Sequence, residues 1–181
     1  MSYLKSLPTD TTLLQVFQAY PETARPLLDF HELVLRAPGP FTPGERELIA
    51  AYVSGTNGCG YCHGVHTVTA EAFGLAKGVL EAALADLGSA PVDERMKPVL
   101  AFVGKLTRTP ARMTDADADA VLAAGWDESA LHSAVLVCAL FNFMNRMVEG
   151  LGIRADETYA VTSGTRLAEG GYAGLATLLG S

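Results

Sequence analysis

The stretch ERELIAAYVSGTNGCGYCHGVH, residues 45–66, determines both the predicted fold and the candidate site. It contains a C-x-x-C motif, Cys59 and Cys62. His66 follows the second cysteine by four residues, and Glu47 precedes the first by twelve. A redox-active thiol pair needs two sulfurs close enough to bridge, a base that makes the thiolate, and access for an oxidant. This segment supplies candidates for the sulfurs and for the base.

Two helices are predicted around this motif, because apolar residues recur at helical spacing in ERELIAAYVSG and again in HGVHTVTAEAFGL. Glycines and an asparagine between them predict a turn, so Glu47 can lean toward the second helix. Cys62 and His66 are i and i+4 on that helix and share a face. Cys59 is expected at or just before its first turn. The helix N-terminus and a protonated His66 both favour a thiolate at Cys62, which is therefore expected to have the lower thiol pKa.

Three other interpretations of the motif are open. A zinc site could use both cysteines and His66, with Glu47 or His63 as the fourth ligand, although no second C-x-x-C or histidine pair follows. A thioredoxin-like motif would follow a β-strand, whereas a helical segment precedes this one. Two unpaired core cysteines would be the plainest interpretation. The third cysteine of the chain, in AVLVCALF, is predicted to be such a core residue.

Composition limits the class of protein. The 181 residues suggest a single domain, residues 1–181, with ample size for a core. The hydrophobic content of 49% favours large buried interfaces and hence a homo-oligomer. The net charge of −7 argues against binding to nucleic acid or to an anionic membrane surface, and no uninterrupted apolar run is long enough for a membrane span. The N-terminal residues lack an apolar signal region, and the few cysteines suit a cytoplasmic protein.

The whole chain is predicted to be all-α, an irregular multi-helix bundle, since no apolar segment alternates like a strand. Start signals are expected at Thr9 or Asp10, at Thr42 with Glu45, at the threonine of TDAD, and at Asp127. PETARPLLDFHELVLR is expected to form a helix with Pro21 near its first turn; the alternative is a helix that begins or is kinked at Pro26. The expected helices cover residues 11–20, 21–36, 43–55, 62–74, 78–88, 95–108, 115–125 and 128–149. The tail, residues 154–181, is less periodic, with at most a short helix near its end.

The spacing Glu-x11-Cys-x2-Cys-x3-His, formed by Glu47, Cys59, Cys62 and His66, resembles the alkylhydroperoxidase AhpD-like branch of the carboxymuconolactone decarboxylase superfamily, in particular its peroxidase-related members. The segment FNFMNRMVEGLGI, residues 141–153, is similar to the C-terminal signature of that group. The resemblance therefore covers most of the chain, and it implies an AhpD-like helical fold.

One departure from the family pattern concerns the proton relay. AhpD has a histidine between its cysteines, where this chain has Tyr61, and a different histidine, His63, follows the pair. Tyr61 and His63 are therefore possible supporting residues. This departure leaves open whether the relay is incomplete or rerouted.

The resemblance implies a thiol-dependent peroxidase in which Cys62 attacks the peroxide, Cys59 resolves the sulfenic acid, and Glu47 accepts the proton through His66 or a water. An external dithiol would reset the pair, and the oligomer would be a dimer, trimer or hexamer. No cofactor is expected, since no flavin, haem or nucleotide-binding motif is present. No metal is expected, since the chain has only one C-x-x-C and is long enough for a core without a structural zinc. Two alternatives are a carboxymuconolactone decarboxylase-like enzyme, although those members generally lack the C-x-x-C, and a non-enzymatic redox-sensing oligomer.

Overall fold

The computed structural model describes residues 2–179, and in this part of the chain the regular secondary structure consists of helices, without a strand. The fold class is therefore confirmed. The α-helices are α1 (Leu13–Ala19), α2 (Pro21–Arg36), α3 (Pro43–Thr56), α4 (Gly60–Ala72), α5 (Val79–Ala85), α6 (Met96–Arg108), α7 (Asp115–Ala123), α8 (Glu128–Gly150) and α9 (Glu157–Ala176). Two short 3₁₀ helices, η1 (Pro110–Arg112) and η2 (Thr177–Leu179), complete the described fold.

The start of α3, the helix that carries Glu47, is defined by a capping box. The Thr42 hydroxyl accepts a hydrogen bond from the Glu45 backbone N–H at 3.2 Å, and the Glu45 carboxylate accepts one from the Thr42 N–H at 2.7 Å. Two N–H groups that have no partner within the helix are thus satisfied. This confirms the predicted start and fixes the register that directs Glu47 toward α4.

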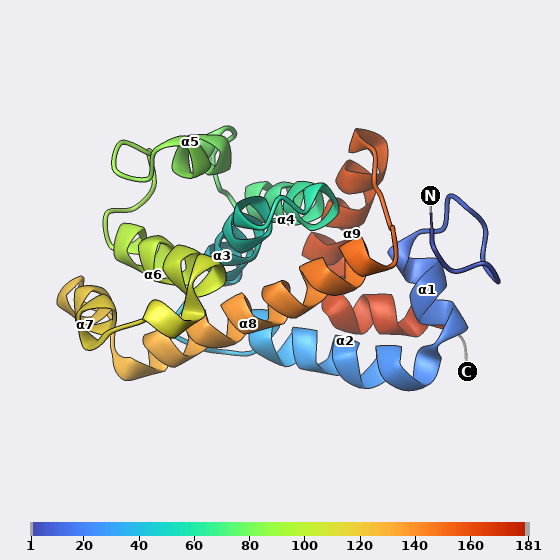
Figure 1. Cartoon of the computed structure of the whole chain (residues 1–181), viewed down its shortest axis with the longest axis horizontal. Helices are drawn as coiled ribbons and strands as arrows, with labels where there is room; N and C mark the ends of the chain where they lie inside the picture. Colours follow the sequence, from blue (N-terminus) through green and yellow to red (C-terminus); the bar gives the residue numbers. More distant parts are fainter. Residues whose placement is uncertain (1, 180–181) are drawn as a thin grey trace.

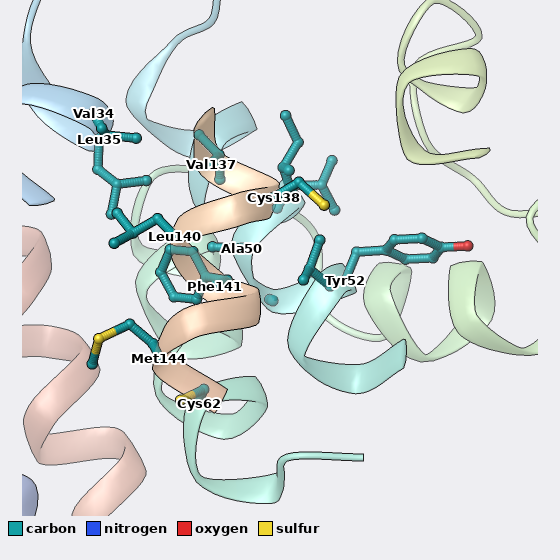
Figure 2. Packing of buried hydrophobic residues seen from close by; sticks show 14 of the residues in the cluster. Val34, Leu35, Ala50, Tyr52, Cys62, Val137, Cys138, Leu140, Phe141 and Met144 are labelled. Atoms are coloured by element: carbon teal, nitrogen blue, oxygen red, sulfur yellow. The ribbon is translucent and has the colours of Figure 1, made fainter. Parts of the chain in front are cut away.

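Helix α8 crosses the middle of the molecule, with α2 below it and α3 and α4 above it in Figure 1. Figure 2 shows Leu140 and Phe141 of α8 close to Leu35 of α2, with Cys62 at the lower end of the same cluster beside Met144. The side chains gathered in this way form one hydrophobic core. The C-x-x-C motif therefore lies at the edge of the hydrophobic core.

By length and composition, α8 is also the one helix in the described residues that could cross a membrane. A buried core helix passes the same test. Here α8 packs against α2, α3 and α6, and Ala134, Val137 and Cys138 on it have no exposed surface. The prediction that the third cysteine, Cys138, is a core residue is confirmed by this burial.

Two expectations at the ends of the chain were wrong. The first helix begins later than expected, because Thr12 rather than Thr9 or Asp10 accepts the capping hydrogen bond, from the Gln15 N–H. The C-terminal tail holds a 20-residue helix, α9, instead of a short one. Asp156 caps it by accepting the Tyr159 N–H at 2.7 Å. Its apolar periodicity is weak because small residues carry its packing against α4 and α2.

Helix α2 runs without a break from Pro21 to Arg36, with Pro26 inside it. The prediction of a helix with Pro21 in its first turn is confirmed, and the helix does not begin at Pro26. The uninterrupted helix carries Glu32 and Arg36, which lie close to the motif, as described below.

Candidate functional site

Glu47 of α3 and His66 of α4 form a hydrogen-bonded pair in the protein interior. The carboxylate Oε2 and the imidazole Nδ1 are 2.6 Å apart, and Glu47 has no exposed surface. This contact confirms the prediction that Glu47 of α3 leans toward α4. Because an ionised carboxylate can only accept, Nδ1 carries the proton. In neutral His66 the other ring nitrogen, Nε2, is therefore unprotonated and can accept a proton.

The other carboxylate oxygen of Glu47 is held by two residues that the sequence analysis did not identify. The Arg36 guanidinium of α2 lies 2.6 Å from Oε1, and the Tyr172 hydroxyl of α9 donates to the same oxygen at 3.4 Å. Burial alone would raise the pKa of Glu47. The charges and hydrogen bonds of His66 and Arg36 outweigh burial, so the pKa is lowered and the group stays ionised.

Tyr172 reaches this position because α9 is kinked at Gly171, whose φ of 61° and ψ of −166° are not helical. The left-handed φ suits glycine. The kink leaves the Tyr172 and Ala173 N–H groups without helical partners, and Glu32 of α2 accepts both, at 2.8 and 3.0 Å. Burial and the nearby Glu47 charge raise the pKa of Tyr172 well above its usual value, so its hydroxyl remains a donor.

The two cysteines are free thiols at the start of α4, where Cys59 is the N-cap residue. The directions of the two pKa shifts run against the expected order. The pKa of Cys59 is lowered because the Cys62 thiol donates a hydrogen bond to it. The pKa of Cys62 is raised well above its usual value by that same hydrogen bond, by burial and by the Cys59 charge. A sulfur pair this close shares one negative charge, and the helix N-terminus alone does not decide which sulfur carries it.

A polar cluster fixes the turn that precedes the cysteines. The Asn57 amide donates to the side-chain oxygens of Asn145 at 2.8 Å and Asn142 at 3.1 Å, both on α8, and Asn145 donates to Ser54 at 3.0 Å. These asparagines therefore tie α8 to the end of α3 and to the turn that follows it. Buried polar groups paired in this way hold the turn rigidly.

Tyr61 and His63, the possible supporting residues, lie in different places. The Tyr61 hydroxyl donates to that of Tyr159 on α9 at 2.9 Å. His63 Nδ1 lies 3.0 Å from the Ala51 carbonyl of α3, and because a carbonyl only accepts, this nitrogen is the donor. His63 is thus engaged with the α3 backbone, while Tyr61 faces α9.

A zinc site would need at least three ligand side chains around one ion. Within residues 2–179 no group of three or more His, Cys, Asp or Glu side chains could hold a metal ion. Two of the candidate zinc ligands, Glu47 and His66, are hydrogen-bonded to each other through the carboxylate and Nδ1.

A pocket opens beside this group between α1, α2, α4, α8 and α9. Cys62, His66 and Tyr61 line it, whereas Cys59 and His63 do not. The remaining lining residues are mostly apolar: Leu13, Leu14, Phe17, Leu28, His31, Val65, Phe141, Met144, Tyr159, Ser163, Arg166, Leu167, Tyr172 and Leu175. A small molecule in this pocket would therefore contact the Cys62 side of the pair, next to the imidazole that can accept a proton.

Sequence reasoning identified the members of the site that lie close together in the chain and missed the distant ones. Arg36, Tyr172 and Glu32 are ordinary helix residues in the sequence, without a motif around them. The glycine pair at 170–171 is the one signal that could have drawn attention to the kink beside Tyr172, because glycines often mark an irregular backbone.

Comparison with known proteins agrees with this description. The carboxymuconolactone decarboxylase family model matches residues 21–103, which include α2 to α4 and the cysteine motif. No curated protein matches the chain. The matched segment contains Glu47, both cysteines and His66, and it agrees with the resemblance inferred from their spacing.

Several solved structures have a similar fold. An uncharacterized peroxidase-related protein from Silicibacter sp. TM1040 has a TM-score of 0.76 at 23% identity, over 82% of this chain and 78% of that one. An AhpD-core, peroxidase-related protein from Ralstonia eutropha JMP134 has a TM-score of 0.75 at 22% identity, with the same coverage. A protein of unknown function from Agrobacterium tumefaciens has a TM-score of 0.67 at 19% identity, over 81% and 99%. At these identities the likeness concerns the fold.

Proposed function

We propose that this chain, which matches the carboxymuconolactone decarboxylase family model over residues 21–103, is a thiol-dependent peroxidase. The observation that carries the proposal is the buried Glu47–His66 pair beside a pocket that Cys62 lines. The fold shared with peroxidase-related proteins supports it. A peroxide entering the pocket would meet a thiol, a proton acceptor and apolar walls.

The chemical step begins when the Cys62 proton passes to Nε2 of His66, whose Nδ1–H is held by Glu47. The growing imidazolium charge is stabilised by this ionised carboxylate. The thiolate attacks the distal peroxide oxygen, the O–O bond breaks, and the proton goes to the departing alkoxide. Cys62 becomes a sulfenic acid and the peroxide becomes an alcohol.

Resolution uses the second sulfur. The Cys59 thiol attacks the Cys62 sulfenic acid, a disulfide forms, and one water leaves with the thiol proton. An external dithiol then reduces this disulfide and is itself oxidised to a disulfide. A reducing compartment such as the cytoplasm would supply it.

Cys62 is assigned as the attacking sulfur despite its raised pKa. Cys59 has the lower pKa but does not line the pocket, and access as well as thiolate fraction sets the rate of a thiol. Because the pKa of Cys62 is raised, the His66 imidazole is needed as the base that removes its proton during the reaction.

The test is consumption of hydrogen peroxide and cumene hydroperoxide with several dithiol donors, beside a Cys62→Ser control. A peroxidase turns over repeatedly, while a redox sensor converts once and stops. Dimedone trapping after one equivalent of peroxide should label Cys62 in the Cys59→Ser protein. Label on Cys59 in the Cys62→Ser protein, with none on Cys62 in the Cys59→Ser protein, would show that the two sulfurs are reversed.

The family model's namesake reaction is the second candidate. The match over residues 21–103 favours it, whereas the C-x-x-C counts against it. Release of carbon dioxide from carboxymuconolactone by the Cys59→Ser and wild-type proteins at the same rate would support this alternative.

A further inference from the structure

The pocket beside Cys62 differs in character between its buried end and its rim. Its buried lining residues include Cys62, His66, Leu28 and Phe141, and most of the others at this end are apolar. The lining residues that remain partly exposed, and therefore mark the rim, include Tyr159, Ser163 and Arg166. The thiol thus lies among buried side chains, and polar groups gather where the pocket meets solvent.

The three polar rim residues come from a single helix. Tyr159, Ser163 and Arg166 occupy positions i, i+4 and i+7 of α9, which places them on one face of that helix. Leu14 of α1 and Leu175 are also partly exposed lining residues. A molecule that enters the pocket therefore meets both polar side chains of α9 and leucines at the rim.

Arg166 brings a cation to this rim that no described residue neutralises. The structure gives its side chain no hydrogen bond, ion pair or ring contact within residues 2–179, whereas Arg36, the other arginine near the site, is paired with Glu47. Glu47 in turn is occupied by Arg36, His66 and Tyr172. The guanidinium of Arg166 is therefore available to a ligand.

A guanidinium at the mouth of an apolar pocket selects a molecule with an anionic group attached to an apolar body, and a carboxylate fits its paired donors. We propose that the substrate class of this site is an organic hydroperoxide that carries a carboxylate, with the hydroperoxide directed to Cys62 and the carboxylate bound by Arg166. This inference rests on the proposed peroxidase function. It names Arg166 as the residue that determines specificity.

The test compares two hydroperoxides with the same chain, linoleic acid hydroperoxide and its methyl ester, in which the ester replaces the anionic carboxylate by a neutral group; both are used below their micellar concentrations. The wild-type protein should prefer the acid in kcat/KM. In Arg166→Gln the acid-to-ester ratio should fall by about tenfold or more, as expected for the loss of a charge-assisted hydrogen bond. Arg112→Gln is the matched control, because Arg112 is exposed in η1 and lies outside the pocket.

Equal kcat/KM for acid and ester in the wild-type protein, or an equal change of the ratio in Arg112→Gln, would overturn the inference. A second measurement, which needs no turnover, separates it from the proposed function. In calorimetric titrations, octanoate should bind the Cys62→Ser protein more tightly than it binds the double variant that also carries Arg166→Gln, while methyl octanoate should bind both proteins equally. If no hydroperoxide is consumed, the peroxidase proposal fails while this binding difference still decides the role of Arg166.

Discussion

His66 Nδ1 and Glu47 Oε2 lie 2.6 Å apart across the α3–α4 interface, and both side chains are buried. This contact fixes the tautomer of neutral His66 and directs its unprotonated nitrogen away from the carboxylate. Arg36 and Tyr172 then hold the opposite oxygen of the carboxylate, so the base is oriented from three other helices. A proton relay needs this kind of fixed geometry.

The first prediction concerns the relay. Glu47→Gln and His66→Ala should each slow oxidation of the thiol by peroxide by roughly 100-fold or more, because both interrupt general-base catalysis. Single-turnover rates followed by thiol titration measure this step. His63→Ala is the control, since His63 bonds to the Ala51 carbonyl and does not line the pocket. Folded Glu47 and His66 variants that react at the wild-type rate would contradict the relay.

The parts of this site that could be predicted from sequence are those encoded locally. The Thr42–Glu45 capping box fixes where α3 starts, and the i, i+4 spacing places His66 on the face of Cys62. Arg36 and Tyr172 could not be predicted, because their approach depends on how α2 and α9 pack. The non-helical backbone of Gly171 brings Tyr172 to the Glu47 carboxylate, and the hydrophobic periodicity of the sequence does not predict such a kink.

The order of the two cysteine pKa values also could not be predicted from local sequence features. The helix N-terminus and the i+4 histidine are local features, and both favour a thiolate at Cys62. The structure adds the Cys62–Cys59 hydrogen bond and the burial of Cys62, which act in the opposite direction. The length of α9 was underestimated because its glycines and alanines serve close packing, and such small residues weaken the apolar periodicity from which a helix is predicted.

The second prediction concerns acid stability. Burial lowers the pKa of His31 from 6.5 to about 4, so the folded state keeps this ring neutral while the unfolded chain takes up a proton. Stability should therefore fall as the pH drops from about 6.5 to about 4, by up to about 3 kcal/mol from this residue. Glu47, whose pKa is lowered, adds a loss only at lower pH, where the unfolded carboxylate becomes protonated.

Urea unfolding at several pH values measures this effect. His31→Gln should flatten the dependence between pH 6.5 and 4, and the exposed His132→Gln controls for loss of a histidine as such. An unchanged slope in His31→Gln would mean that other groups cause the acid sensitivity.

The third prediction tests the packing of α9 on α4. A Cβ atom at Gly164 would lie 2.7 Å from the Val65 carbonyl oxygen and 2.7 Å from the Val68 Cβ, which is too close without movement of the helices. Gly164→Ala should lower the free energy of unfolding by about 1–3 kcal/mol, as overpacking does. Gly174→Ala on the same helix is the control, because nothing lies within 4 Å of its added Cβ. Equal urea midpoints for both variants would contradict the close approach.

The fourth prediction concerns assembly. Leu33 and Phe30 of α2 are 66% and 43% exposed, and Phe143 of α8 is 52% exposed, which is unusual for large apolar side chains in a monomer. With the hydrophobic composition, this leads us to expect a homo-oligomer. Sedimentation equilibrium should give a mass that is a multiple of 19.1 kDa. A single species with the 19.1 kDa mass of one chain at micromolar concentration would contradict it.

The last prediction concerns the shared charge of the cysteine pair. Cys59→Ser should lower the pKa of Cys62, because the hydrogen bond with Cys59 and the Cys59 charge both raise it. Glu149→Gln should lower the pKa of Cys59, since the hydrogen bond to the Glu149 carboxylate and its charge raise that value. Glu128→Gln, at the opposite end of α8, is the matched control. The pH dependence of iodoacetamide alkylation, resolved by peptide mass spectrometry, reports each thiol separately. If Cys62 is alkylated at lower pH than Cys59 in the wild-type protein, the helix N-terminus and His66 outweigh the sulfur pair, and the order expected from sequence is restored.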